Sequence, residues 1–219
     1  MIRQAIIPLA GLGTRLLPLT SVFAKELLPM NGKPGIEYIL DECIDAGIKE
    51  VVFIISKNKM MIKDYFYKDS FYKKIIKKKG DKRIISEYRK ILKYKRMIKF
   101  VYQNKPLGTG DAVLKTKKFI KDKYFLMLLP DDLIIKRNCS KEMIRISIKN
   151  KCSVMASMKV KKNNVSRWGI YSVSKRLNKD NFFIKDVIEK PTIKNAPSTN
   201  AVIGRYILPK KIFSKLKNI

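Results

Sequence analysis

The chain has 219 residues, which is at the upper end of one ordinary domain and too short for two large ones. Hydrophobic residues make up 46% of it, enough for a sizeable core, and this excludes wholesale disorder. There are 49 Lys and Arg against 18 Asp and Glu, a formal net charge of +31, and no histidine, which excludes imidazole bases, Ser-His and Cys-His nucleophiles and His-ligated zinc.

Short apolar runs alternate with segments of helical periodicity along the whole chain. The predicted strands are 5–9, 51–55, 99–102, 124–129, 153–160, 169–173, 184–188 and 202–208. Several of these are continuous apolar blocks, as expected for strands buried on both faces of a mainly parallel sheet. The predicted helices are 36–47, ending at Gly47, then 111–120 and 140–150. This order predicts an α/β doubly wound fold, with 1–219 as a single domain.

A basic segment interrupts this alternation. Residues 73–99 contain 13 basic residues against Asp81 and Glu87. Their apolar residues recur at helical spacing, so we expect an amphipathic helical insertion near 68–97 with a solvated basic face. A helix that binds nucleic acid or a membrane surface is the alternative.

The overall charge has two interpretations. Clustered basic residues are typical of proteins that bind nucleic acid. Here lysine supplies 39 of the basic residues and arginine only 10, although arginine recognises phosphates and bases better. The excess runs through every segment, which favours a lysine-rich solvated surface with no specific nucleic-acid partner.

Cysteine usage and hydropathy indicate in which cellular compartment the protein is expected. The three cysteines, Cys43, Cys139 and Cys152, have no CxxC spacing and are odd in number, so neither a disulfide framework nor a zinc site is indicated. The N-terminal apolar run is broken by Pro8 and then by glycines, and no stretch is long enough to span a bilayer. We expect a cytoplasmic protein without a membrane partner.

A glycine-rich loop follows the first predicted strand. Gly11 and Gly13 allow backbone N–H groups to close around an anion, and Arg15 and Lys25 can neutralise an oligophosphate. The loop fits neither the GxGxxG nor the GxxxxGK[ST] pattern. Asp131 follows the apolar run 125–129, where open α/β sheets place their ligands, and its carboxylate suits Mg²⁺. A helix cap is the structural alternative for Asp131.

Several motifs together resemble the sugar-phosphate nucleotidyltransferases. They are Gly11-x-Gly13-Thr14-Arg15-x-x-Pro18 with Lys25 and Pro29, Lys33-Pro34-Gly35, Gln103 to Val113, Leu129-Pro130-Asp131-Asp132, Val187-Ile188-Glu189-Lys190-Pro191 and Gly204-Arg205-Tyr206. Within this family the chain is most similar to the bacterial members that use UTP and glucose 1-phosphate. The resemblance implies a Rossmann-like fold of the nucleotide-diphospho-sugar transferase type.

The resemblance also implies a reaction and a set of site residues. A phosphate oxygen of glucose 1-phosphate attacks the α-phosphorus of UTP, giving UDP-glucose and pyrophosphate. The nucleophile is already an anion, so a chain without histidine can catalyse the step. The implied catalytic residues are Arg15, Lys25 and Asp131, with Asp131 also holding Mg²⁺. The implied nucleotide-binding residues are Ala10, Gly11, Gly13, Thr14, Glu26, Gln103 and Gly108, and the sugar-phosphate residues are Gly169, Glu189 and Lys190.

The chain also departs from the family pattern. Ala24 stands where relatives usually have proline before the catalytic-loop lysine. Relatives continue beyond the position matched by Ile219 with elements that close the sugar site and form subunit contacts, so we expect a missing C-terminal portion and a possible homo-oligomer. The alternatives are a nucleotidyltransferase for dTTP or another sugar 1-phosphate, an inactive remnant, and a lysine-rich nucleic-acid-binding protein.

Overall fold

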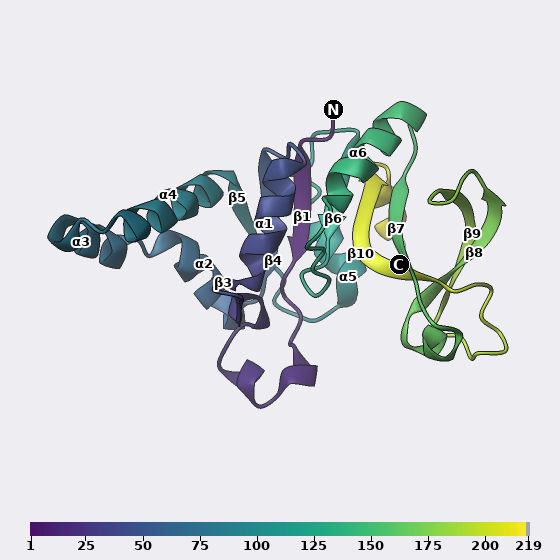
Figure 1. Ribbon diagram of the computed structural model, residues 1–219, viewed down its shortest axis with the longest axis horizontal. Helices are drawn as coiled ribbons and strands as arrows, with labels where there is room; N and C mark the ends of the chain where they lie inside the picture. Colours follow the sequence, from purple (N-terminus) through teal and green to yellow (C-terminus); the bar gives the residue numbers. More distant parts are fainter. Residues whose placement is uncertain (218–219) are drawn as a thin grey trace. The chain divides into compact units, whose positions relative to one another are not determined.

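A computed structural model describes residues 1–217 of the chain (Figure 1). Its residues group into two compact units. The first unit contains Met1–Val154 and the chain from Tyr206 onward, and the second contains Met155–Arg205. The second unit is therefore a continuous segment inserted into the first. That the whole chain acts as a single domain stays a prediction.

A parallel sheet forms the centre of the first unit. Its strands lie in the order β5 (Ile98–Tyr102), β4 (Glu50–Ile55), β1 (Gln4–Pro8) and β6 (Tyr124–Leu128). Ile6 of β1 is in register with a β4 residue on one side and a β6 residue on the other. These strands are almost wholly apolar because helices cover both of their faces.

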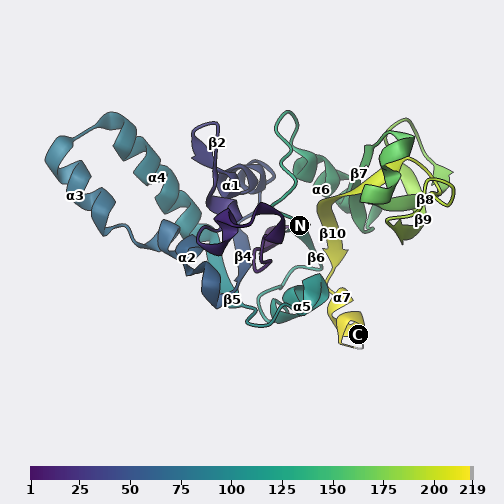
Figure 2. The ribbon, with the colours of Figure 1, turned by 90° about the horizontal axis from the view of Figure 1, so that it is seen from below.

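The helices of this unit lie on both faces of the sheet. Helices α1 (Gly35–Asp45) and α6 (Cys139–Asn150) cover one face, and α5 (Gly108–Lys115) and α7 (Ile212–Leu216) cover the other (Figure 2). On the α5 side, the core combines apolar residues of β1, β4 and β6 with Phe213 of α7, whose ring stacks on Phe125 at 5.4 Å. Gly47 lies just beyond α1 at φ 83°, the left-handed conformation predicted for the end of this helix.

The basic segment forms two helices, the second of which leads into β5. They are α3 (Ser70–Lys79) and α4 (Lys82–Met97), separated at Gly80, which has φ 62°. Asp81 caps α4 by accepting from two backbone N–H groups of its first turn. The segment is therefore helical, as predicted. Helix α2 (Met60–Tyr67), which we did not predict, leads into it.

Helix α4 is held against the rest of the first unit by both apolar and polar contacts. The ring of Phe66 in α2 packs against the ring of Phe53 in β4 and against the ring of Tyr94 in α4. The Tyr94 hydroxyl donates to Asp41 of α1 at 2.6 Å, and desolvation raises the pKa of this phenol. Lys90 of α4 pairs with the buried Glu37 of α1 at 2.7 Å. Lys95 also pairs with Asp69 at 3.5 Å and lies over the Tyr67 ring. The other charged side chains of α4 are exposed.

The second unit is antiparallel. Strand β8 (Gly169–Arg176) pairs with β9 (Phe182–Glu189) and, at Ile170, with Ala201 of β10 (Asn200–Pro209). Strand β7 (Val154–Lys159) also pairs with β10. A small core contains Val165, Ile170 and Ala201. The parallel and antiparallel parts together confirm the predicted α/β class with a mixed sheet.

Some predicted boundaries were wrong, and some short elements were missed. The helix predicted at 111–120 begins earlier, at Gly108, and ends at Lys115, where Thr116 turns the chain by donating to the Val113 carbonyl at 2.7 Å. A hairpin of β2 (Pro29–Met30) and β3 (Lys33–Pro34) turns through two residues with positive φ. Three 3-10 turns lie between residues 14 and 27. Within residues 1–217, no helix is both long and apolar enough to cross a membrane.

Candidate active site

The glycine-rich loop leaves β1 and folds back on itself. Gly13 has φ 71°, a conformation that L side chains rarely adopt, and its carbonyl accepts from the Thr20 hydroxyl at 2.9 Å. A Cβ atom on Gly13 would lie 3.2 Å from the Thr20 side chain, whereas Gly11 has open space around it. Ala10 is buried, and Thr14 and Arg15 are exposed. The loop thus presents open backbone and a free guanidinium to solvent, as an anion site requires.

Lys25 and Asp131 meet at the carboxyl edge of the parallel sheet. Asp131 follows β6, and Lys25 lies in a 3-10 turn after the glycine-rich loop. The Lys25 ammonium is 2.8 Å from a carboxylate oxygen of Asp131. The Asp131 side chain is 57% exposed and that of Lys25 is 22% exposed. The pair therefore remains open to an incoming ligand.

Glu26, the neighbour of Lys25, faces the interior. Its two carboxylate oxygens accept from the Lys59 ammonium at 2.8 and 2.9 Å, and both side chains are buried. Burial lowers the pKa of Lys59, while the Glu26 charge acts in the opposite direction. In this arrangement, Glu26 anchors the turn that carries Lys25. The charge pattern of the sequence did not reveal Lys59, because its partner is far away along the chain.

Gln103 and Gly108 come together just after the end of β5. The Gln103 backbone N–H donates to the Ile55 carbonyl at 2.9 Å, which ties the end of β5 to that of β4. The Gln103 side-chain amide donates to the Gly108 carbonyl at 3.0 Å and to Asp111 at 2.7 Å. Gly108 has φ 85° at the start of α5. The amide is thus held by two acceptors, one of them a carboxylate that sequence analysis did not assign to the site.

The predicted sugar-phosphate residues all lie within the second unit. Gly169 and Glu189 are opposite each other in the β8–β9 pair. A Cβ on Gly169 would lie 2.9 Å from a Glu189 carboxylate oxygen and 3.2 Å from a Val202 methyl group. Lys190 has φ 45°, which is uncommon for a residue with a side chain, and its N–H donates to the Trp168 carbonyl at 3.0 Å. The backbone therefore holds Glu189 and Lys190 in a defined turn.

Among the predicted site residues, Asp131 is the candidate metal ligand. In the described part of the chain, no group of three or more His, Cys, Asp or Glu residues could hold a metal ion. Asp131 offers an exposed carboxylate beside the glycine-rich loop. Such a donor fits Mg²⁺, which uses one or two carboxylates and takes its remaining ligands from phosphate and water.

The chain matches a protein family over nearly its whole length. The model of the family described as "Nucleotidyl transferase" covers residues 4–219. A UTP–glucose-1-phosphate uridylyltransferase of Bacillus subtilis is 36% identical over all of this chain and 73% of its own length. The enzyme of the same name from Streptococcus pyogenes is 35% identical over 99% of this chain and 72% of its own.

Solved structures give the same result. A UDP-glucose pyrophosphorylase in complex with UDP-glucose matches all of this chain and 80% of its own, with a TM-score of 0.86 and 35% identity. A UTP-bound UGPase from Acinetobacter baumannii matches all of this chain and 78% of its own, with a TM-score of 0.92 and 31% identity. These similarities confirm the family resemblance carried by the motifs. The chain therefore belongs to the nucleotidyl transferase family.

Proposed function

We propose that this protein transfers the uridylyl group of UTP to glucose 1-phosphate, forming UDP-glucose and releasing pyrophosphate. The observation that carries the proposal is the Lys25–Asp131 pair beside an open glycine-rich loop at the carboxyl edge of the sheet. The relatives named for this activity support the choice of substrates. A cytoplasmic location fits the three cysteines, which form no disulfide with one another in residues 1–217.

The reaction needs charge neutralisation and alignment rather than a base. The attacking phosphate oxygen of glucose 1-phosphate carries a negative charge at neutral pH. It forms a bond to the α-phosphorus of UTP as the bond from that phosphorus to the bridging oxygen breaks, and pyrophosphate leaves with the electron pair. Two polyanions must therefore be brought together in line, and cations must balance the charge that develops.

Residues of the first unit supply the nucleotide side of this chemistry. The backbone of Gly11 and Gly13, with the exposed Arg15, binds the UTP phosphates. Lys25 leaves Asp131 and binds the α-phosphate, where its charge stabilises the transition state. Its anchored neighbour Glu26 keeps the turn in place during this exchange.

Asp131 is the proposed ligand of Mg²⁺. When bound, this ion would screen the phosphate charges and polarise the phosphorus that is attacked. Asp131 can accept it because its carboxylate is more than half exposed and pairs with Lys25, a side chain that the phosphates can draw away. With Lys25 on the α-phosphate, the Asp131 carboxylate would be available to hold this ion.

The remaining residues recognise the base and the sugar phosphate. Gln103 reads uracil through its side-chain amide oxygen, which can accept from the base N3–H while its NH₂ group donates to Gly108 and Asp111. Gly108 lets the base approach the backbone closely. Glu189 accepts from glucose hydroxyls, and Lys190 neutralises the phosphate of glucose 1-phosphate. The absence of a side chain at Gly169 leaves the Glu189 carboxylate in its position.

A pyrophosphate-release assay tests the proposal. Purified protein is incubated with Mg²⁺ and glucose 1-phosphate, and with UTP, dTTP, CTP, GTP or ATP in separate reactions. We expect release with UTP, and none with any nucleotide when glucose 1-phosphate is omitted. Preference for dTTP would instead favour the thymidylyl alternative. A folded protein that releases no pyrophosphate from any pair would overturn the proposal and favour an inactive remnant.

A further inference from the structure

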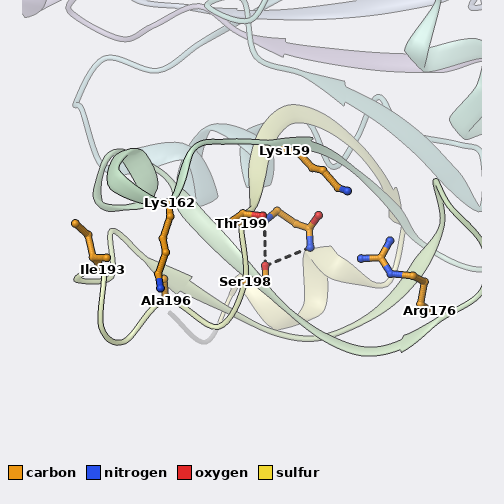
Figure 3. Close-up of a pocket in the computed structure, with 8 residues that line it drawn as sticks. Lys159, Lys162, Arg176, Ile193, Ala196, Ser198 and Thr199 are labelled. Atoms are coloured by element: carbon orange, nitrogen blue, oxygen red, sulfur yellow. Dashed lines mark hydrogen bonds between the residues drawn. The ribbon is translucent and has the colours of Figure 1, made fainter.

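The second unit contains a cavity that the proposed reaction does not use. It has a volume of about 410 Å³, and its walls come from β7, β8 and the segment leading into β10 (Figure 3). This volume is in the range of sites that hold small organic ligands. Neither Gly169, Glu189 nor Lys190 lines it. Arg176 is seven residues beyond Gly169 along β8, a separation of roughly 20 Å in an extended strand.

Every charged residue that lines the cavity is basic. They are Lys159, Lys162 and Arg176, and all three are exposed. In residues 1–217, none of them forms an ion pair with a carboxylate. Figure 3 shows Lys159 and Arg176 toward one end of the cavity and Lys162 toward the other. Uncompensated cations around a concave surface attract an anion with more than one negative charge.

The Arg176 guanidinium is held in place by its own surroundings. One of its nitrogens donates to the Lys179 carbonyl at 3.3 Å, and the group lies 5.6 Å from the centre of the Phe182 ring. Phe182 is directly opposite Arg176 in the β8–β9 pair. An arginine restrained in this way loses less entropy when it binds an oxyanion, and its planar fork suits a phosphate group.

The polar side of the cavity is also ordered. The Ser198 hydroxyl donates to the Tyr171 carbonyl at 2.7 Å and accepts from the backbone N–H of Asn200 at 3.0 Å and from its side-chain amide at 3.3 Å. The Thr199 carbonyl accepts from the Val160 N–H at 3.0 Å. Asn200 is buried. Ser198, Thr199 and Asn200 thus line the cavity from a segment whose hydrogen bonds hold it in place.

From these features we infer that the cavity is a second anion site, which binds a small phosphorylated molecule through Lys159, Lys162 and Arg176. Two cations at one end and one at the other fit a diphosphate, or a phosphate ester whose organic part lies against Ile193, which also lines the cavity. The site is independent of the proposed reaction, because none of its residues belongs to the nucleotide or sugar-phosphate sets.

The test is a titration of ¹⁵N-labelled Lys190→Ala protein with inorganic pyrophosphate, followed by amide chemical shifts. Lys190→Ala removes the proposed sugar-phosphate cation, so that binding at the cavity is observed separately. We expect saturable shifts at Ser198, Thr199 and Asn200, and about tenfold weaker binding after Lys162→Ala or Arg176→Ala is added. Parallel titrations with inorganic phosphate and glucose 6-phosphate distinguish charge alone from a phosphate ester with an organic part.

Two exposed lysines of the same unit provide matched controls. Lys161 is the chain neighbour of Lys162, Lys185 lies on β9, and neither lines the cavity. Lys161→Ala and Lys185→Ala should change the dissociation constant less than about twofold, as surface charges outside a site do. Equal weakening by controls and site variants would overturn the inference in favour of a diffuse basic surface. No saturable shift at Ser198 to Asn200 with any of the three probes would also overturn it.

Discussion

The ammonium of Lys25 lies 2.8 Å from the carboxylate of Asp131, at the edge where β1 and β6 both end. Each group balances the charge of the other while the nucleotide is absent. An oligophosphate with its metal ion offers both groups stronger partners, so that the same pair can separate when substrate binds. The first two predictions concern this exchange.

Lys25→Ala should lower the rate of pyrophosphate release by about 10²–10³-fold, because it removes the cation that balances charge at the α-phosphate. The free energy of unfolding should change by less than about 1 kcal/mol, since the pair is partly exposed. Initial rates and urea unfolding measure the two effects. Lys57→Ala, which removes another exposed lysine, should leave the rate unchanged. A Lys25→Ala enzyme of normal rate would contradict the assigned role.

Asp131→Asn should raise the Mg²⁺ concentration needed for half-maximal rate by about tenfold or more, because an amide is a weaker ligand for a hard cation than a carboxylate. A magnesium titration at saturating UTP measures this value. Asp180→Asn removes an exposed carboxylate from the β8–β9 turn and serves as the control. If the Asp131 variant lost rate with an unchanged Mg²⁺ dependence, Asp131 would act on Lys25 alone.

Lys59→Met should destabilise the protein by about 3–5 kcal/mol, because it leaves the Glu26 carboxylate buried without its counter-ion. Urea unfolding measures the loss. The double variant Lys59→Met/Glu26→Leu removes both charges and should recover most of it. Failure of the double variant to recover stability would mean that Lys59 acts through packing rather than through Glu26.

Gly169→Ala should raise the KM for glucose 1-phosphate by about tenfold and leave the KM for UTP unchanged. The new methyl group would lie 2.9 Å from the Glu189 carboxylate oxygen, so this side chain must shift from its binding position. Steady-state kinetics with each substrate varied separately measure the two values. Gly110→Ala, whose Cβ would meet a Leu216 methyl group at 3.4 Å, is the control. An equal rise in both KM values would contradict the assignment of Glu189 to the sugar.

Gln4→Met should make the free energy of unfolding depend less on pH in the acidic range. The Gln4 amide donates to Glu50 at 3.0 Å, and this bond lowers the pKa of the Glu50 carboxyl below its ordinary value, with burial opposing and Lys99 adding to the effect. Glu50 therefore stabilises the fold above its unfolded pKa, and this contribution is lost as pH falls through the lowered folded pKa.

The variant should thus have a higher Glu50 pKa by carboxyl NMR, and its loss of stability should be larger at pH 7 than at pH 3. Some loss of stability is expected at both pH values. The side-chain oxygen of Gln4 accepts from the backbone N–H groups of Lys121 and Asp122, and these groups would lose their partner. An unchanged Glu50 pKa would show that Lys99, rather than Gln4, controls this carboxyl.

Local patterns in the sequence predicted the long elements well. The buried strands are continuous apolar runs, and the helix that ends at Gly47 has both an apolar face and a terminating glycine. The hairpin at Asn31-Gly32 was missed although its signal is present, since both residues have positive φ and Asn-Gly favours such two-residue turns. The 3-10 turns near Lys25 depend on tertiary contacts and have no comparable local pattern.

In the candidate site, the residues that stand in motifs could be proposed from the sequence, and those that act through tertiary contacts could not. Its glycines, Lys25, Asp131 and Gln103 stand in motifs, and the sequence alone supplied them. Lys59 and Asp111 could not be found in this way. Each reaches its partner, Glu26 or Gln103, through the packing of one element against another, and a lysine or an aspartate by itself carries no sign of that contact.

The insertion of the second unit into the first affects the order in which the chain can fold during synthesis. Phe213 of α7 completes the core cluster that begins with Ile6 of β1, and the ribosome makes it only after all of residues 155–205. The nascent first unit therefore lacks one part of its apolar core while the second unit is being made. Contacts between such distant parts of a chain close slowly, and transiently exposed apolar surface is a target for chaperones.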